Sequence, residues 1–211
     1  MKKGLFIAFE GIDGCGKSTQ AWLLGKHLSE LDKYNHIILT REPWKNQDIR
    51  KILRADEDPH SEAEKLARLF TEDRKQHVEI LIKSMTRKTA HVISDRYSFS
   101  TLAYQQAQGM SLNKLLKMHK GLLIPDIIFI IDLSAKIALQ RMKKDNVRKT
   151  EQKFEKDEKF IRKLRTTYLN LKNLKDHKVV IIDGSKKPEE VTKQIKEEFN
   201  NFYKKIVNLI K

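Results

Sequence analysis

Residues 10–20, "EGIDGCGKSTQ", hold the pattern that decides the fold. The pattern is G-x-x-x-x-G-K-[ST], and its fixed positions are Gly11, Gly16, Lys17 and Ser18. An apolar run over 4–9 precedes it and a helical pattern over 17–31 follows, which is the strand–loop–helix context that the motif requires. Glycine lets the backbone direct successive N–H groups at phosphate oxygens, and the helix adds the positive end of its dipole. The stretch therefore predicts a loop that binds the phosphates of a nucleoside triphosphate.

The side chains of this loop suit a nucleotide bound with magnesium. Lys17 can reach the β- and γ-phosphates, and the Ser18 hydroxyl can bind Mg²⁺. Cys15 is the only cysteine of the chain, so it has no partner for an internal disulfide, and it is small enough to fit the turn. We expect the whole loop to contact ATP, through Gly11, Ile12, Asp13, Gly14, Cys15, Gly16, Lys17, Ser18 and Thr19.

Length and composition indicate one domain that is polar for its size. The chain has 211 residues, of which 39% are hydrophobic and 34% are charged. No apolar run approaches the ~20 residues that a membrane span needs, and we expect a cytoplasmic protein. The net charge of +15 has three interpretations: a nucleic-acid footprint, a pocket that gathers several phosphates, or a lysine-rich composition without local meaning.

Short apolar runs alternate along the chain with longer segments of helical period. The expected strands are 4–9, 36–40, 91–94, 127–132 and 178–182. The expected helices are about 17–31, 60–85, 98–107, 111–120, 134–144, 154–173 and 187–209. Near-continuous apolar strands separated by helices indicate a parallel sheet covered on both faces. The pattern therefore predicts a three-layer α/β protein.

A second motif indicates which kind of nucleotide enzyme this is. "DRYSFSTLAYQ" (95–105) follows the third expected strand, and the sequence has neither a late Walker-B run of paired acids nor the guanine-reading Asn-Lys-x-Asp. In these features the chain resembles the thymidylate kinases, which move the γ-phosphate of ATP onto dTMP. The other matching stretches are "FEGIDGCGKST" (9–19), "TREP" (40–43), "IRKIL" (49–53), "LFTEDR" (69–74), "PDIIFIIDL" (125–133) and "VVIIDGS" (179–185).

The resemblance implies a P-loop NTPase fold with a five-stranded parallel sheet of order 2-3-1-4-5 flanked by helices. It further implies one nucleoside monophosphate kinase domain over 1–211, which forms a homodimer. It also implies a helix after "TREP", over about 49–53.

The acceptor side, where the nucleotide that receives the phosphoryl group binds, is expected around Phe70 and Arg74. These residues lie four apart and so project from one helix face. A ring there can stack on a base and a guanidinium can donate to the base edge. Spacing alone, however, favours a core ring and a solvated arginine, because aromatic residues at helical spacing usually pack in the core. By resemblance, Phe70 stacks on thymine and Arg74 meets its O4. The whole set implied for dTMP is Asp13, Glu42, Arg50, Phe70, Arg74, Arg96, Thr101, Tyr104 and Gln105.

The resemblance gives several members of this set a role. Arg96 grips the acceptor phosphate, and the neighbouring Asp95 holds Mg²⁺ through water, so that Ser18 and Asp95 form the metal site. Asp13 meets the 3′-hydroxyl, and Tyr104 crowds the 2′ side of the sugar. The remaining implied roles are a second phosphate contact for Arg50, ordering of the magnesium and acceptor site for Glu42, and recognition of the pyrimidine edge by Thr101 and Gln105.

A basic segment indicates a lid over the phosphates. Lys and Arg outnumber Asp and Glu across 141–165, and the phosphate-binding loop itself has no arginine. In the family such loops are paired with basic residues from a lid, here about 141–156, although a solvated helix face would show the same charges. The expected contacts are Arg148 and then Lys153 on the transferring phosphate, Arg141 on the adenine, and Ser185 as a further ATP contact.

The leading hypothesis is an ATP- and Mg²⁺-dependent kinase that converts dTMP to dTDP. Its expected catalytic residues are Lys17, Asp95, Arg96, Arg148 and Lys153. The alternatives are a related kinase that prefers another base, such as dUMP, a nucleic-acid-binding P-loop ATPase, and a non-catalytic nucleotide-binding subunit. We expect nucleotides and a second copy as partners, without nucleic acid or membrane. Trp44 either covers the base pocket or packs elsewhere, and the sequence leaves both open.

Overall fold

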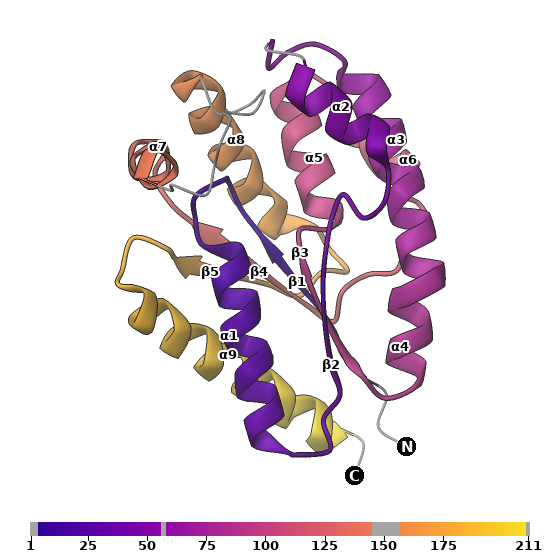
Figure 1. Cartoon of the computed structure of the whole chain (residues 1–211), viewed down its shortest axis with the longest axis vertical. Coiled ribbons are helices and arrows are strands. Elements are labelled where there is room, and N and C mark those ends of the chain that lie inside the picture. The colour runs from indigo at the N-terminus through magenta and orange to yellow at the C-terminus, as the bar shows by residue number, and fades with distance from the viewer. Residues whose placement is uncertain (1–3, 56–57, 145–156, 210–211) are drawn as a thin grey trace.

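The computed structural model describes residues 4–55, 58–144 and 157–209, which form a parallel sheet between two layers of helices (Figure 1). The strands are β1 (Phe6–Glu10), β2 (Ile37–Arg41), β3 (His91–Asp95), β4 (Ile127–Asp132) and β5 (Val179–Asp183). Their order is β2-β3-β1-β4-β5, and every pairing is parallel. The P-loop NTPase fold with sheet order 2-3-1-4-5 is therefore confirmed, and each strand lies within two residues of its expected bounds.

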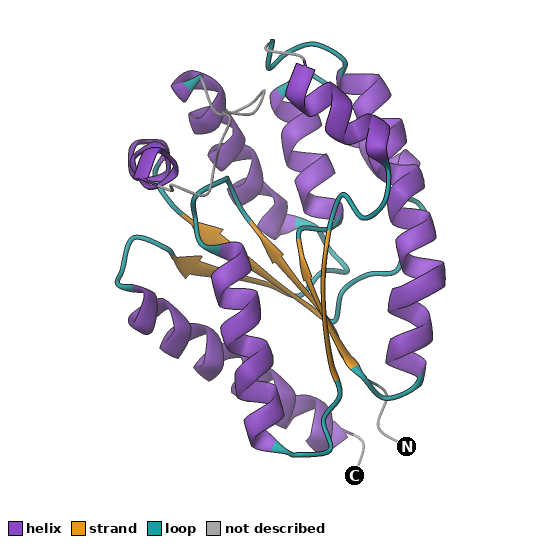
Figure 2. Ribbon diagram, viewed as in Figure 1, coloured by secondary structure: helices purple, strands orange, loops and turns teal. Residues whose placement is uncertain are grey.

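The helices cover both faces of this sheet (Figure 2). They are α1 (Lys17–Leu31), α2 (Gln47–Ala55), α3 (Ala63–His77), α4 (Lys83–Arg87), α5 (Ser98–Ala107), α6 (Leu112–Met118), α7 (Ala135–Lys144), α8 (Glu158–Asn170) and α9 (Pro188–Leu209). α1 packs against α9 on one face, whereas α5 packs against α3 and α8 on the other (Figure 1). The single helix expected over 60–85 is interrupted, because a π-helical segment, η1 (Val78–Ile82), widens the hydrogen-bond register between α3 and α4. A 3₁₀ turn, η2 (Leu171–Asn173), extends α8.

The burial of the strands follows their position in the sheet. Every residue of β1 and β3 is buried, and so is all of β4 except its last residue. The edge strands β2 and β5 are mostly half-buried. Interior strands covered on both faces are continuously apolar, which is why their pattern was visible in the sequence. Within the described ranges, no helix is both long and apolar enough to span a bilayer.

A charged residue ends every strand of the sheet. These residues are Glu10, Arg41, Asp95, Asp132 and Asp183. Because the strands are parallel, all five lie at the same edge of the sheet, where open α/β folds bind their ligands.

Candidate active site

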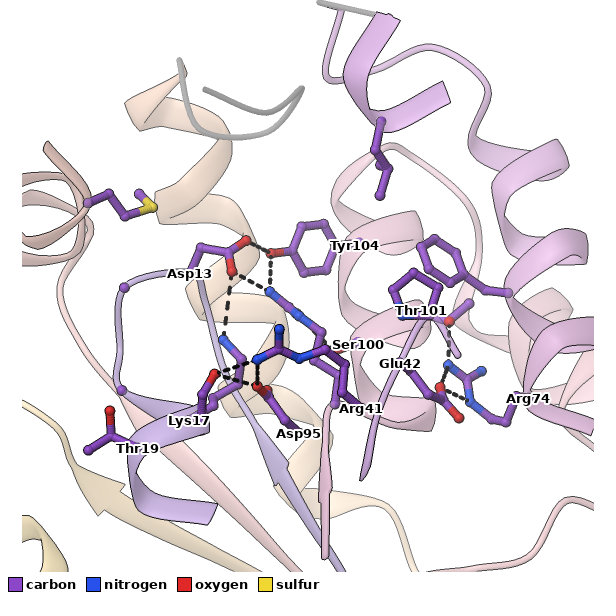
Figure 3. A pocket seen from close by; sticks show the side chains of 18 of the residues that line it. Asp13, Lys17, Thr19, Arg41, Glu42, Arg74, Asp95, Ser100, Thr101 and Tyr104 are labelled. Atoms are coloured by element: carbon purple, nitrogen blue, oxygen red, sulfur yellow. Dashed lines mark hydrogen bonds and ion pairs between the residues drawn. The ribbon is translucent and has the colours of Figure 1, made fainter. Parts of the chain in front are cut away.

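A hollow of about 510 Å³ opens at this carboxyl edge of the sheet (Figure 3). One side is the loop after β1 with the start of α1, and the other side is built from the ends of β2 and β3 together with α3 and α5. The lining residues are Asp13, Gly14, Gly16, Lys17, Ser18, Thr19, Arg41, Glu42, Pro43, Leu53, Phe70, Arg74, Asp95, Arg96, Ser100, Thr101, Tyr104, Arg141 and Met142. Five of these side chains are cationic and three are carboxylates, so the hollow suits anionic ligands.

The phosphate-binding loop turns at glycines that no other residue could replace without strain. Gly11 has φ +134°, and a Cβ there would lie 2.6 Å from the carbonyl oxygen of Ile131. Lys17 is buried, and its Nζ donates to the Ile12 carbonyl at 2.9 Å, so the amine is held against the loop. Burial raises the pKa of the Cys15 thiol, which agrees with a small packing residue rather than a reactive thiolate.

Ser18 and Asp95 meet at the base of the hollow. The Ser18 hydroxyl donates to Asp95 Oδ2 at 2.5 Å, and Asp95 Oδ1 is buried without a hydrogen-bond partner among the described residues. Burial opposes ionisation of this carboxyl, but the charge of Lys17, the Ser18 hydroxyl and two guanidinium groups together lower the pKa of Asp95. The carboxylate is therefore ionised at neutral pH.

The Ser18 hydroxyl and the Asp95 carboxylate are suited to binding a magnesium ion. Mg²⁺ is usually bound by one or two carboxylates together with water and substrate phosphates, rather than by a cage of protein ligands. The described residues contain no group of three or more His, Cys, Asp or Glu side chains that could hold a metal ion. The ionised Asp95, with its unpartnered Oδ1, and the hydroxyl of Ser18 supply the oxygen donors that such an ion needs.

Arg96 contacts residues on both sides of the hollow. Its Nη2 donates to Asp13 Oδ1 at 2.6 Å and to the Tyr104 hydroxyl at 3.2 Å, and its Nη1 donates to Ser100 Oγ at 3.0 Å. The Tyr104 hydroxyl in turn donates to Asp13 Oδ2 at 2.9 Å. Arg96 also has φ +72°, a left-handed conformation that is uncommon outside glycine and clusters at functional sites.

Glu10, at the end of β1, fixes the helix that carries this wall. Its carboxylate accepts the backbone N–H of Tyr97 at 2.8 Å and the N–H and hydroxyl of Ser100 at 3.1 and 2.7 Å. The carboxylate of Glu10, on β1, therefore caps the first turn of the helix α5. Burial raises the pKa of this fully buried carboxyl, although the hydrogen bonds of Ser100 and Tyr97 oppose the shift.

Arg74 is buried in a polar network rather than solvated. Its Nε donates to Glu42 Oε2 at 2.8 Å, and its Nη2 donates to the Tyr97 carbonyl and to Thr101 Oγ1, both at 3.0 Å. Its Nη1 lies 3.2 Å from Nε2 of His119. Burial, with smaller effects from Arg74 and Lys75, lowers the pKa of His119 to about 3, so the imidazole is neutral and accepts this bond. The solvated alternative for Arg74 is therefore excluded.

Of the remaining residues expected at the acceptor side, one lines the hollow and two do not. Phe70 is half-buried and lines the hollow with Leu53 and Pro43. Arg50 is exposed on α2, donates to the Trp44 carbonyl at 3.5 Å and does not line the hollow. Gln105 is also outside the lining. It is fully buried and donates to Gln108, and its Oε1 has no hydrogen-bond partner within the described ranges.

Trp44 packs against α3 and does not line the hollow. Its ring stacks on His77 with centroids 5.1 Å apart, and Lys45 Nζ lies 4.0 Å from the indole. The buried carboxylate of Asp73 accepts the backbone N–H groups of Trp44 at 2.5 Å and of Lys45 and Asn46 at 2.9 Å. Asp73 thus holds the short loop that follows β2.

On the ATP side, Arg141 lines the hollow beside Met142 and donates from Nη2 to the Gly184 carbonyl at 3.0 Å. Ser185 is exposed, donates to Asp183 Oδ1 at 2.6 Å and does not line the hollow. Arg148 and Lys153, with the lid beyond residue 144, lie outside the described residues.

Sequence reasoning missed several residues that organise this site, namely Glu10, Arg41, Ser100 and His119. Glu10 and Arg41 carried a signal, because each is a charged residue at the end of a β-strand pattern and within a quoted motif. His119 carried none, since its place beside Arg74 depends on how α6 packs against α3 and α5.

Comparisons with known proteins show which family this chain resembles. A family model described as thymidylate kinase matches residues 9–195. A probable thymidylate kinase of Thermococcus kodakarensis is 36% identical over 200 residues, which cover 90% of this chain and 95% of that protein. The thymidylate kinase of Thermosipho africanus is 37% identical, with 91% and 96% covered, and a probable thymidylate kinase of Methanococcus maripaludis is 35% identical, with 97% and 96% covered. The chain belongs to the thymidylate kinase family.

Proposed function

We propose that the protein transfers the γ-phosphoryl group of ATP to dTMP with Mg²⁺, yielding dTDP and ADP. One observation carries the proposal: a single hollow is lined both by a phosphate-binding loop and by a wall with a half-buried ring and a buried guanidinium. Arg96 contacts both, through Asp13 on the loop and Tyr104 on the wall. Two nucleotides bound there would meet at their phosphates, as direct transfer requires.

We propose that Arg74 recognises the edge of thymine by a hydrogen bond. A guanidinium has five N–H donors, and the contacts of Arg74 within the described chain account for Nε, both hydrogens of Nη2 and one hydrogen of Nη1. The remaining Nη1–H suits the O4 acceptor of thymine and opposes the amino group of cytosine at that position. Phe70 would stack on the base, and the unpartnered Oε1 of Gln105 would accept from its N3–H.

The phosphates would lie between Lys17 and Arg96. In phosphoryl transfer the protein contributes mainly position and charge neutralisation. Lys17 would hold the β- and γ-phosphates, and Arg96 would hold the acceptor phosphate. Ser18 and Asp95 would hold Mg²⁺, which supplies further neutralisation of phosphate charge when bound.

The adenine side and the lid complete the proposal. Arg141 would lie against the adenine, and Arg148, with Lys153 as the second choice, would reach the transferring phosphoryl group from the lid at about 141–156. Closure of that lid would also keep water from the γ-phosphate. Ser185, Arg50 and Gln105 are the least supported contacts, because none of these side chains lines the hollow.

The test is a coupled assay of ADP release against dTMP, dUMP, dCMP and UMP. We expect dTMP to be used best, dCMP to be rejected by Arg74, and UMP to be disfavoured because Tyr104 lines the sugar position. Efficient use of dUMP would favour the alternative of a kinase with a broader base preference, since uracil presents the same edge and lacks only the methyl group. Failure with all four nucleotides would refute the proposal.

We also propose that the protein is cytoplasmic, as expected from its composition, and that it acts as a homodimer, as the resemblance implied. Ile80, on η1, is 58% exposed and offers apolar surface that a second copy could cover. Sedimentation equilibrium tests the assembly, and a monomer at micromolar concentration would exclude it.

A further inference from the structure

We propose that the guanidinium of Arg41 competes with the divalent cation for Ser18 and Asp95, so that the metal binds well only together with nucleotide phosphates. This inference rests on the proposed function, because it takes Ser18 and Asp95 as the metal site. It concerns a residue that has no part in the reaction as described above.

The sheet itself places Arg41 beside the metal site. Arg41 ends β2 and Asp95 ends β3, and the parallel register pairs these two residues directly. From there Arg41 Nη2 donates to Asp95 Oδ2 at 2.9 Å (Figure 3). The same nitrogen donates to Ser18 Oγ at 3.0 Å. One nitrogen therefore occupies the two oxygens that a P-loop metal site uses.

A guanidinium and a metal ion compete for these oxygens. Mg²⁺ binds its oxygen ligands at about 2.0–2.1 Å. The Ser18 hydroxyl already donates its hydrogen to Asp95. Arg41 and a metal ion would therefore both bind to the lone pairs of the Ser18 oxygen. A positive charge held 3 Å from these atoms also repels a divalent cation. We therefore expect coordination of the ion by Ser18 to displace the Arg41 side chain.

The side chain is free to make this movement. It is 64% exposed, whereas the Asp95 side chain is 10% exposed, and an ion pair with one exposed partner is weak enough to exchange. A second hollow of about 260 Å³, lined in part by Trp22 and Leu39, lies against Arg41 and provides space for the displaced group. Nucleotide phosphates would supply the additional ligands that make displacement favourable.

The experiment measures Mn²⁺ binding by electron paramagnetic resonance, with the full-length protein and without nucleotide. We expect Arg41→Met to bind Mn²⁺ about fivefold more tightly than the wild type, equivalent to about 1 kcal/mol, and Arg41→Lys to fall between them. The matched control is Lys26→Met, which removes the same charge from α1 more than two turns from Ser18, at a side chain that is 59% exposed and paired with a glutamate. This control should change the affinity by less than twofold.

Equal Mn²⁺ affinities of Arg41→Met and the wild type would overturn the inference, because the ion would then use Asp95 Oδ1 and leave Arg41 in place. An equal gain in Lys26→Met would also overturn it, since only net charge would matter. With ADP present, the advantage of Arg41→Met should shrink. The proposed function is tested separately: wild-type ADP release with dTMP, together with weaker Mn²⁺–ADP binding by Asp95→Asn, would keep it standing even where Arg41 has no effect.

Discussion

Replacing Glu42 with glutamine removes one charge from a buried ion pair and leaves the side-chain volume almost unchanged. Glu42 and Arg74 have side chains that are 3% and 1% exposed, and two guanidinium nitrogens lie 2.8 and 2.6 Å from Oε2. Breaking such a pair leaves an uncompensated buried charge, which costs about 3–5 kcal/mol. Glutamine still offers one acceptor oxygen, so we expect about 3 kcal/mol, or a fall of about 6–12 °C in Tm for a chain of this size.

The chain contains a matched control. Asp132 and Arg165 form a pair of similar geometry, with nitrogen–oxygen distances of 2.6 and 2.8 Å, but their side chains are 22% and 40% exposed. Solvent screens this pair, so Asp132→Asn should cost about 1 kcal/mol or less. Urea unfolding of the two variants at neutral pH measures both values. If Glu42→Gln is destabilised no more than Asp132→Asn, burial does not set the strength of these pairs and the reasoning is wrong.

Two further predictions follow. Because the folded pKa of His119 is about 3 and an unfolded histidine titrates near 6.5, the unfolded state binds the proton first, and stability is lost as pH falls below 6.5. His119→Asn should therefore reduce the loss of unfolding free energy between pH 6.5 and 4.5 by about 2 kcal/mol, and an unchanged pH slope would show that the imidazole is not kept neutral. Arg148→Ala should lower kcat at least tenfold with little change in the KM for ATP; a larger effect of Lys153→Ala would assign the lid cation to Lys153 instead.

The layout of the sheet could be predicted because its signals are local. Interior strands such as β3 and β4 are buried on both faces, so each appears as an uninterrupted apolar run that can be located without knowing its neighbours. The phosphate-binding loop was predictable for the same reason, since its chemistry lies in consecutive residues. The interruption at η1 could not be predicted, because a π-helical turn keeps nearly the same apolar periodicity as the α-helix around it.

The partners within the site could not be predicted, because they are far apart in the sequence. Arg41 meets Asp95 through strand register, and Asp73 meets the backbone of Trp44 across the packing of α3 against the loop after β2. No local pattern encodes such pairs. For Arg50, a local motif was present but the expected neighbour was not. The motif indicated a phosphate contact, whereas the side chain lies outside the hollow.

The charges of the site form an organised set rather than a diffuse basic surface. Each of its three carboxylates holds one guanidinium, in the pairs Asp13–Arg96, Glu42–Arg74 and Asp95–Arg41. Lys17 and Arg141 are the remaining cations of the lining, so the hollow contributes only two of the fifteen net positive charges of the chain. The composition therefore says little about the site. Arg74 and Arg96, which carboxylates fix in advance, need no reorganisation when nucleotides arrive, and this preorganisation, rather than the total charge, is what favours phosphoryl transfer.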